Sequence, residues 1–115
     1  MSSWVRQRFQ HLKKWREYAE SIARAVSDIA PDSKVYVIGG VGEERITVLS
    51  DIDILIITPR ENLANKRKLY IQVLTKAIDQ YGLPWDAPIE LHITSMEEAE
   101  EYLKHAKKKI EIKPE

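Results

Sequence analysis

The feature that most constrains this chain is a hydrophobic run from Asp51 to Ile57 that opens with two aspartates, Asp51 and Asp53. Side chains alternate between the two faces of a β-strand, so residues two apart point the same way. Because the run is aliphatic beyond the carboxylates, we expect a central strand over residues 51–57 that is buried on both faces. Asp51 and Asp53 would then project together from the start of that strand.

Two carboxylates at the start of a buried strand indicate a binding site. Charged side chains are rarely buried unless they are paired or bind a metal ion, and two adjacent carboxylates repel each other unless a cation lies between them. Oxygen ligands suit a hard divalent cation such as magnesium. Asp51 and Asp53 therefore predict a Mg²⁺ site, with a solvated strand edge as the alternative.

A glycine pair, Gly39-Gly40, precedes Asp51 by ten intervening residues. It follows a short β-branched run over residues 34–38, which predicts a strand that ends in a turn. Glycines at such a turn let the backbone approach a ligand closely, and backbone N–H groups there bind anions such as a triphosphate. Taken alone, a glycine pair more often marks a plain turn.

Residues 88–94 alternate in polarity and predict a third strand, with Glu90 and His92 on its polar face. If this strand neighbours residues 51–57, Glu90 adds a third carboxylate to the aspartate pair. Three carboxylates around one or two divalent ions support nucleotidyl transfer, in which Glu90 binds the second ion or accepts the proton of the attacking hydroxyl. His92 is interpreted as a solvated or hydrogen-bonded histidine, with a contact to substrate or metal as the alternative.

The rest of the chain predicts helices that alternate with these strands. The apolar spacing and capping signals favour helices over residues 4–30, from the Thr58–Glu61 capping box to residue 81, and from the Ser95–Glu98 capping box to about residue 107. Residues 110–112 are either an edge strand or a frayed tail. The order α-β-(α)-β-α-β-α, with a short helical turn within residues 41–49, predicts one α/β (α+β) domain over residues 1–115. Its small mixed sheet would be flanked by helices.

Composition narrows the function classes. Eighteen basic and eighteen acidic residues cancel, so charge gives no support for nonspecific nucleic-acid binding. The chain has no cysteine, which excludes disulfides and thiolate metal sites. It contains no membrane-length apolar run and no signal-peptide core at its start, so we expect a cytoplasmic protein that does not enter a membrane. Trp15 belongs to the apolar stripe of the first helix. If the rings of Trp4 and Trp85 are exposed, they could form an interface, and a homodimer is then a possible state of the protein.

Gly39-Gly40, ten residues and Asp51-x-Asp53 together resemble the signature of the polymerase-beta-like nucleotidyltransferase superfamily, most closely its minimal nucleotidyltransferases. The resemblance covers most of the chain, and Glu90 matches the third carboxylate by strand context. It implies a nucleotidyltransferase fold, Mg²⁺ with up to two ions, and ATP or another nucleoside triphosphate as the donor.

The resemblance also implies a partner. Short members of this family often pair with a helical HEPN protein as a toxin–antitoxin system, and some of these antitoxins adenylylate a tyrosine of the toxin. Arg45 would represent a basic residue common between the glycines and the aspartates. Two positions depart from the family pattern: Gly40 stands where serine is frequent, and Glu90 where aspartate is more frequent. The alternative is therefore a nucleotidyltransferase fold kept for binding alone, which neutralises its partner by occlusion.

Overall fold

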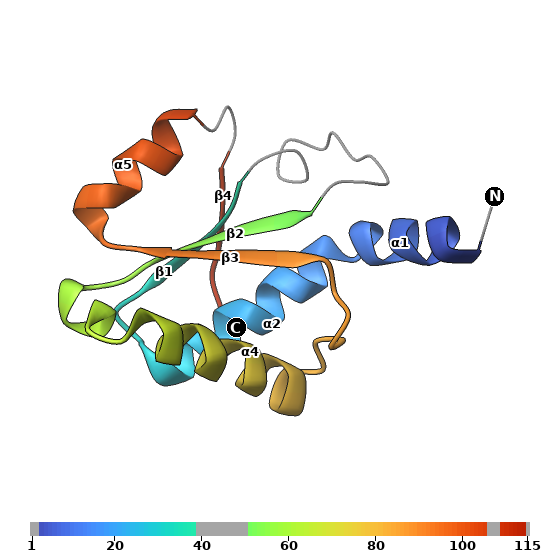
Figure 1. Ribbon diagram of the computed structural model, residues 1–115, viewed down its shortest axis with the longest axis horizontal. Coiled ribbons are helices and arrows are strands. Elements are labelled where there is room, and N and C mark those ends of the chain that lie inside the picture. The colour runs from blue at the N-terminus through green and yellow to red at the C-terminus, as the bar shows by residue number, and fades with distance from the viewer. Residues whose placement is uncertain (1–2, 39–50, 106–108, 115) are drawn as a thin grey trace.

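A four-stranded mixed sheet organises the chain in the computed structural model, which describes residues 3–38, 51–105 and 109–114 (Figure 1). The strands are β1 (Lys34–Ile38), β2 (Ile52–Ile57), β3 (Ile89–Thr94) and β4 (Ile110–Ile112), in the order β3-β2-β1-β4. β1 runs antiparallel to both β2 and β4, whereas β2 and β3 are parallel. This sheet, with helices on both faces, confirms the predicted fold class.

Helices cover the two faces of the sheet unequally. They are α1 (Ser3–Lys13), α2 (Trp15–Ile29), the short 3₁₀ helix η1 (Arg60–Leu63), α4 (Lys66–Tyr81) and α5 (Met96–His105). α2 and α4 lie side by side on one face, α5 lies over the other, and α1 extends beyond the sheet (Figure 1). Within the described ranges, no helix has the length and apolar character needed to cross a membrane.

The main core lies between the sheet and the α2–α4 layer. β2 supplies its alternate residues Ile52, Ile54 and Ile56, all fully buried, because every second side chain of the strand faces the helices. α2 adds the stripe expected from the sequence: Trp15, Ala19, Ile22 and Val26. This stripe is therefore a core face rather than a seam for a partner. A smaller cluster on the opposite face joins Leu55 and Ile57 to α5.

The continuous helix predicted over residues 4–30 is wrong: α1 and α2 meet at Lys14, whose ψ of 17° departs from helical geometry. Across the break, the Tyr18 hydroxyl lies 2.7 Å from Nδ1 of His11, and Nε2 of His11 lies 3.4 Å from Oδ2 of Asp86. Burial and the charge of Asp86 raise the pKa of Tyr18, so the phenol keeps its proton and can donate to His11. These contacts tie the bend to the loop before β3.

The helix predicted to begin at Thr58 begins instead at Lys66. Thr58 is buried, and its hydroxyl oxygen accepts a hydrogen bond from the Asn62 side chain at 2.8 Å, so it does not cap a helix. The cap of α4 is Asn65, whose side chain accepts from the backbone N–H of Lys68 at 3.0 Å.

One other local prediction is confirmed, and the structure decides between the two alternatives for the tail. The hydroxyl of Ser95 accepts from the backbone N–H of Glu98 at 3.3 Å, as expected for a residue that caps α5. The tail forms the edge strand β4, which pairs with β1 from Val35 to Val37.

Gly82 ends α4 in the left-handed region, with φ of 73°. An added Cβ would meet no atom within 4 Å, so the effect of Gly82→Ala comes from the backbone conformation alone. We expect this change to lower the free energy of unfolding by about 1 kcal/mol, measured by urea denaturation. Gly82→Asn should cost less, since asparagine tolerates this conformation better. Equal stability of the alanine variant and the wild type would contradict the argument.

Candidate active site

The register between β2 and β3 creates the candidate active site. Asp53 pairs directly with Glu90, and Leu55 pairs with His92 two residues further along. Laterally paired residues share a face of a sheet, so Asp53, Glu90 and His92 project together, on the face opposite α2 and α4. The third strand therefore neighbours the strand that contains Asp53, as the sequence analysis required for a shared site. Glu90 lies beside the carboxylate of Asp53.

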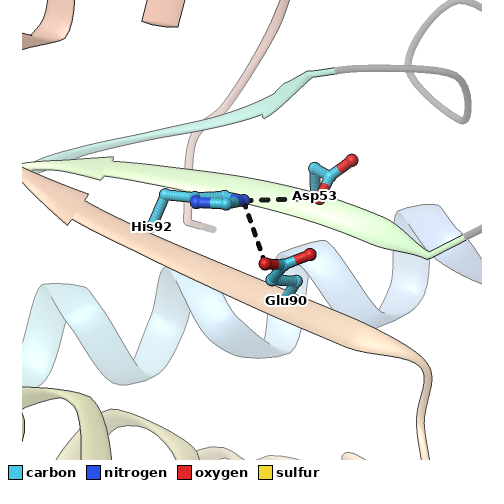
Figure 2. Close-up of side chains that lie close together, drawn as sticks. All are labelled: Asp53, Glu90 and His92. Atoms are coloured by element: carbon cyan, nitrogen blue, oxygen red, sulfur yellow. Dashed lines mark hydrogen bonds and ion pairs between the residues drawn. The ribbon is translucent and has the colours of Figure 1, made fainter.

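The imidazole of His92 links the two carboxylates (Figure 2). Its Nε2 atom lies 3.3 Å from Oδ1 of Asp53 and 4.0 Å from Oε1 of Glu90. One possible ligand atom from each of the three side chains lies within 4.8 Å of the other two. Within the described ranges, this is the only group of three or more histidine, aspartate or glutamate side chains that could hold a metal ion. Glu90 is the most exposed of the three, with 58% of its side chain accessible.

α5 packs beside the cluster of Asp53, Glu90 and His92 and does not cover its carboxylates. Ala99 of α5 packs with Leu55 in the smaller apolar cluster, and Tyr102 lies at the edge of that cluster. The rings of Tyr102 and His92 are tilted by 50° with their centroids 5.5 Å apart. This contact holds the imidazole at the border between the apolar cluster and solvent, with its Nε2 atom facing Asp53 and Glu90 (Figure 2).

Asp51 does not occupy the strand position that the sequence predicted. β2 begins at Ile52, whose N–H donates to the carbonyl of Pro88 at 2.7 Å, and Asp51 is the exposed residue just before it. Asp51 thus lies one residue before the strand, and it is not a member of the group formed by Asp53, Glu90 and His92. Its role as a metal ligand stays a prediction.

The predicted phosphate-binding residues Gly39, Gly40 and Arg45, and the expected helical turn within residues 41–49, lie outside the described residues. Their roles also stay predictions.

His92 is the site residue that the sequence interpretation left outside the predicted ligand set. The hydrogen bond expected for it is present, with Asp53 as the partner. A signal for its place in the cluster existed, since Glu90-x-His92 repeats the two-residue spacing of Asp51-x-Asp53 on a neighbouring strand. The spacing alone could not show that both carboxylates would lie against the same imidazole nitrogen.

The donor set fits a divalent cation. Two carboxylates and one imidazole supply oxygen and nitrogen ligands of the kinds that Mg²⁺, Mn²⁺ and Zn²⁺ use in proteins. The carboxylates are adjacent on paired strands, Asp53 half-buried and Glu90 exposed, and a cation between them would offset their repulsion. The group therefore could hold a metal ion on the open face of the sheet.

Two solved structures share the fold of this chain. One is a proposed nucleotidyltransferase from Sulfolobus solfataricus, which superposes with a TM-score of 0.60 at 16% identity and covers 96% of this chain and 87% of its own. The other, also described as a proposed nucleotidyltransferase, has a TM-score of 0.55 at 22% identity, with 77% of this chain and 90% of its own covered. At these identities the likeness shows the fold. No curated protein matches the chain.

The sequence also matches a protein family along most of its length. The profile described as nucleotidyltransferase domain matches residues 19–114, a span that includes all four strands and the three residues of the cluster. The agreement of this profile with the fold supports the polymerase-beta-like nucleotidyltransferase superfamily. The chain therefore belongs to the nucleotidyltransferase domain family.

Proposed function

We propose that this protein is a metal-dependent nucleotidyltransferase that moves a nucleoside monophosphate, AMP from ATP, onto a hydroxyl group. Family membership implies a nucleoside triphosphate substrate and a divalent cation. The observation that carries the proposal is the pairing of Asp53 with Glu90 on the open face of the sheet, where both carboxylates can reach one ion.

Each predicted residue has a distinct role in this proposal. Asp53 and Glu90 hold the cation, and Asp51, exposed at the entrance to β2, adds a carboxylate toward the same nucleotide. Gly39-Gly40 and Arg45 contact the triphosphate. The bound cation, Mg²⁺ in the family pattern, would neutralise charge on the phosphates and act as a Lewis acid at the α-phosphate.

The transfer itself is a displacement at the α-phosphorus. The acceptor hydroxyl oxygen forms a bond to phosphorus, the bond to the bridging oxygen breaks, and pyrophosphate leaves. Glu90 has a second role: the carboxylate oxygen that does not hold the cation accepts the proton of the acceptor hydroxyl, because this carboxylate is the most exposed of the cluster and so the most accessible to an incoming substrate.

We further propose that the acceptor is a tyrosine of a helical HEPN-type partner in the cytoplasm, with this chain as the antitoxin. The resemblance to minimal nucleotidyltransferases supports this finer proposal. The ring of Trp85 supports it as well, because it is 85% exposed in the loop that leads into β3, the strand that carries Glu90. Exposed aromatic rings are enriched at protein interfaces.

The test incubates the protein with Mg²⁺, a HEPN-type acceptor protein and ATP labelled either at the α- or at the γ-phosphate. We expect label on a partner tyrosine from α-labelled ATP only, together with release of pyrophosphate. Replacing that tyrosine with phenylalanine should remove the label. If the toxin is neutralised without label, and equally well by the Asp53→Asn variant, the protein acts by occlusion and the transferase proposal fails.

A further inference from the structure

We infer that His92 is a direct ligand of the divalent cation, and that the site therefore binds Mn²⁺ more tightly than Mg²⁺. The inference rests on the proposed function for the presence of a cation and extends it to the third ligand and to the choice of ion. In the family pattern the ligands are carboxylates, and Glu90 matches the third of them, whereas here the group around Asp53 and Glu90 also contains an imidazole nitrogen, that of His92.

The distances around Nε2 of His92 fit a shared ion. Ligands bound at about 2.1 Å to one octahedral or tetrahedral ion lie roughly 3 to 4 Å from each other. Nε2 is 3.3 Å from the Asp53 carboxylate and 4.0 Å from the Glu90 carboxylate. An ion among these three atoms would take the place of the hydrogen bond between His92 and Asp53.

The surroundings of His92 favour this orientation. The residue lies in the middle of β3 opposite Leu55, which is fully buried, so its backbone position is set by the sheet. Tyr102 packs against its ring from α5. A histidine held in place by backbone pairing and ring packing loses little conformational freedom when it binds an ion.

A comparison with His11 shows why two carboxylates beside one ring nitrogen distinguish His92 as a metal ligand. His11 also lies near a carboxylate, with Nε2 3.4 Å from Asp86, but its Nδ1 contacts the Tyr18 hydroxyl at 2.7 Å. Protein partners thus engage both ring nitrogens of His11, and only one of these partners is a carboxylate. His11 therefore provides a matched control, a histidine–carboxylate pair outside the cluster.

The identity of the third ligand bears on the choice of ion. Mg²⁺ binds oxygen ligands almost exclusively and keeps several waters, whereas imidazole nitrogen suits transition metals. An imidazole beside the two carboxylates thus strengthens the binding of Mn²⁺, which accepts both oxygen and nitrogen, relative to that of Mg²⁺. The two carboxylates are oxygen ligands, which Mn²⁺ also binds. Mn²⁺ supports phosphoryl transfer as Mg²⁺ does.

The experiment measures metal binding to the protein without nucleotide. Free Mn²⁺ is counted by electron paramagnetic resonance, Mg²⁺ by competition, and pulsed measurements detect nitrogen coupled to bound Mn²⁺. We expect wild type to bind Mn²⁺ at least about tenfold more tightly than Mg²⁺ and to show coupling to one imidazole nitrogen. His92→Gln should lose the coupling and about tenfold in Mn²⁺ affinity, with Mg²⁺ affinity nearly unchanged. His11→Gln should behave as wild type.

If His92→Gln fails to fold, labelling the histidines with ¹⁵N in the wild type and in His11→Gln still tests the inference, because the coupling must change from ¹⁴N to ¹⁵N in both proteins. Bound Mn²⁺ without nitrogen coupling, coupling that persists in His92→Gln, or no Mn²⁺ binding would overturn the inference. Failure here is separate from failure of the proposed function. Transfer of AMP without nitrogen coupling leaves the transferase intact, and nitrogen coupling without transfer leaves the metal site intact.

Discussion

Replacing Asp53 with asparagine is expected to lower kcat/KM for nucleotidyl transfer by about 100- to 1,000-fold. The change removes the charge that would hold the cation but keeps an oxygen and a similar shape. It also leaves a partner for Nε2 of His92, which lies 3.3 Å from Oδ1 of Asp53. The measurement is the rate of pyrophosphate release at saturating and at limiting ATP. Urea denaturation should show that the free energy of unfolding changes by less than about 1 kcal/mol.

Asp86→Asn provides the control for this prediction. Asp86 is also a partly exposed aspartate beside a histidine, at 3.4 Å from His11, but it lies in the loop before β3 and contacts the α1–α2 bend. The variant should keep wild-type transfer. A value of kcat/KM for Asp53→Asn above about one tenth of the wild-type value would contradict a metal-holding role. Asp51→Asn, assayed in parallel, reports whether the exposed carboxylate before β2 shares that role.

Replacing Ile54 with alanine is expected to lower the free energy of unfolding by about 2 to 5 kcal/mol, from lost burial and the cavity left behind. Ile54 is fully buried at the centre of β2, where it pairs with Val37 of β1 and Leu91 of β3. Urea denaturation followed by circular dichroism measures the change.

Ile71→Ala is the matched control, because the same atoms are removed from a side chain that is 52% exposed on α4. It should change the free energy of unfolding by less than about 0.5 kcal/mol. If both variants lose a similar free energy of unfolding, the packing of β2 against α2 and α4 is not the main source of stability.

The sequence predicted the paired part of the site because strand alternation is a local rule. The alternating pattern around Glu90 and the aliphatic run after Asp53 identified two strands and the face of each carboxylate. The predicted strand started one residue early, at Asp51, because strand pairing begins at Ile52 and hydrogen bonding to another segment sets that boundary. The position of His92 beside both carboxylates depends on strand register, which no single segment encodes.

The helices differed from prediction for a similar reason. The apolar stripe continues through the bend at Lys14, so its period gives no sign of two helices, and neither glycine nor proline marks the break. The Thr58 capping signal was a good local match, but Thr58 is buried and its hydroxyl serves Asn62 instead. Tertiary contacts decide between competing caps, and here Asn65 is the cap used.

The parallel pairing of β2 and β3 has a consequence for folding. Asp53 and His92 are 39 residues apart in the chain and meet only when α4 has crossed from one strand to the next. The ligand cluster therefore does not exist in the unfolded chain, and an ion that binds it stabilises only the native state. At a concentration 100 times its dissociation constant, such an ion adds about 2.7 kcal/mol to the free energy of unfolding. The concentration of metal ion would thus set part of the stability of the folded protein.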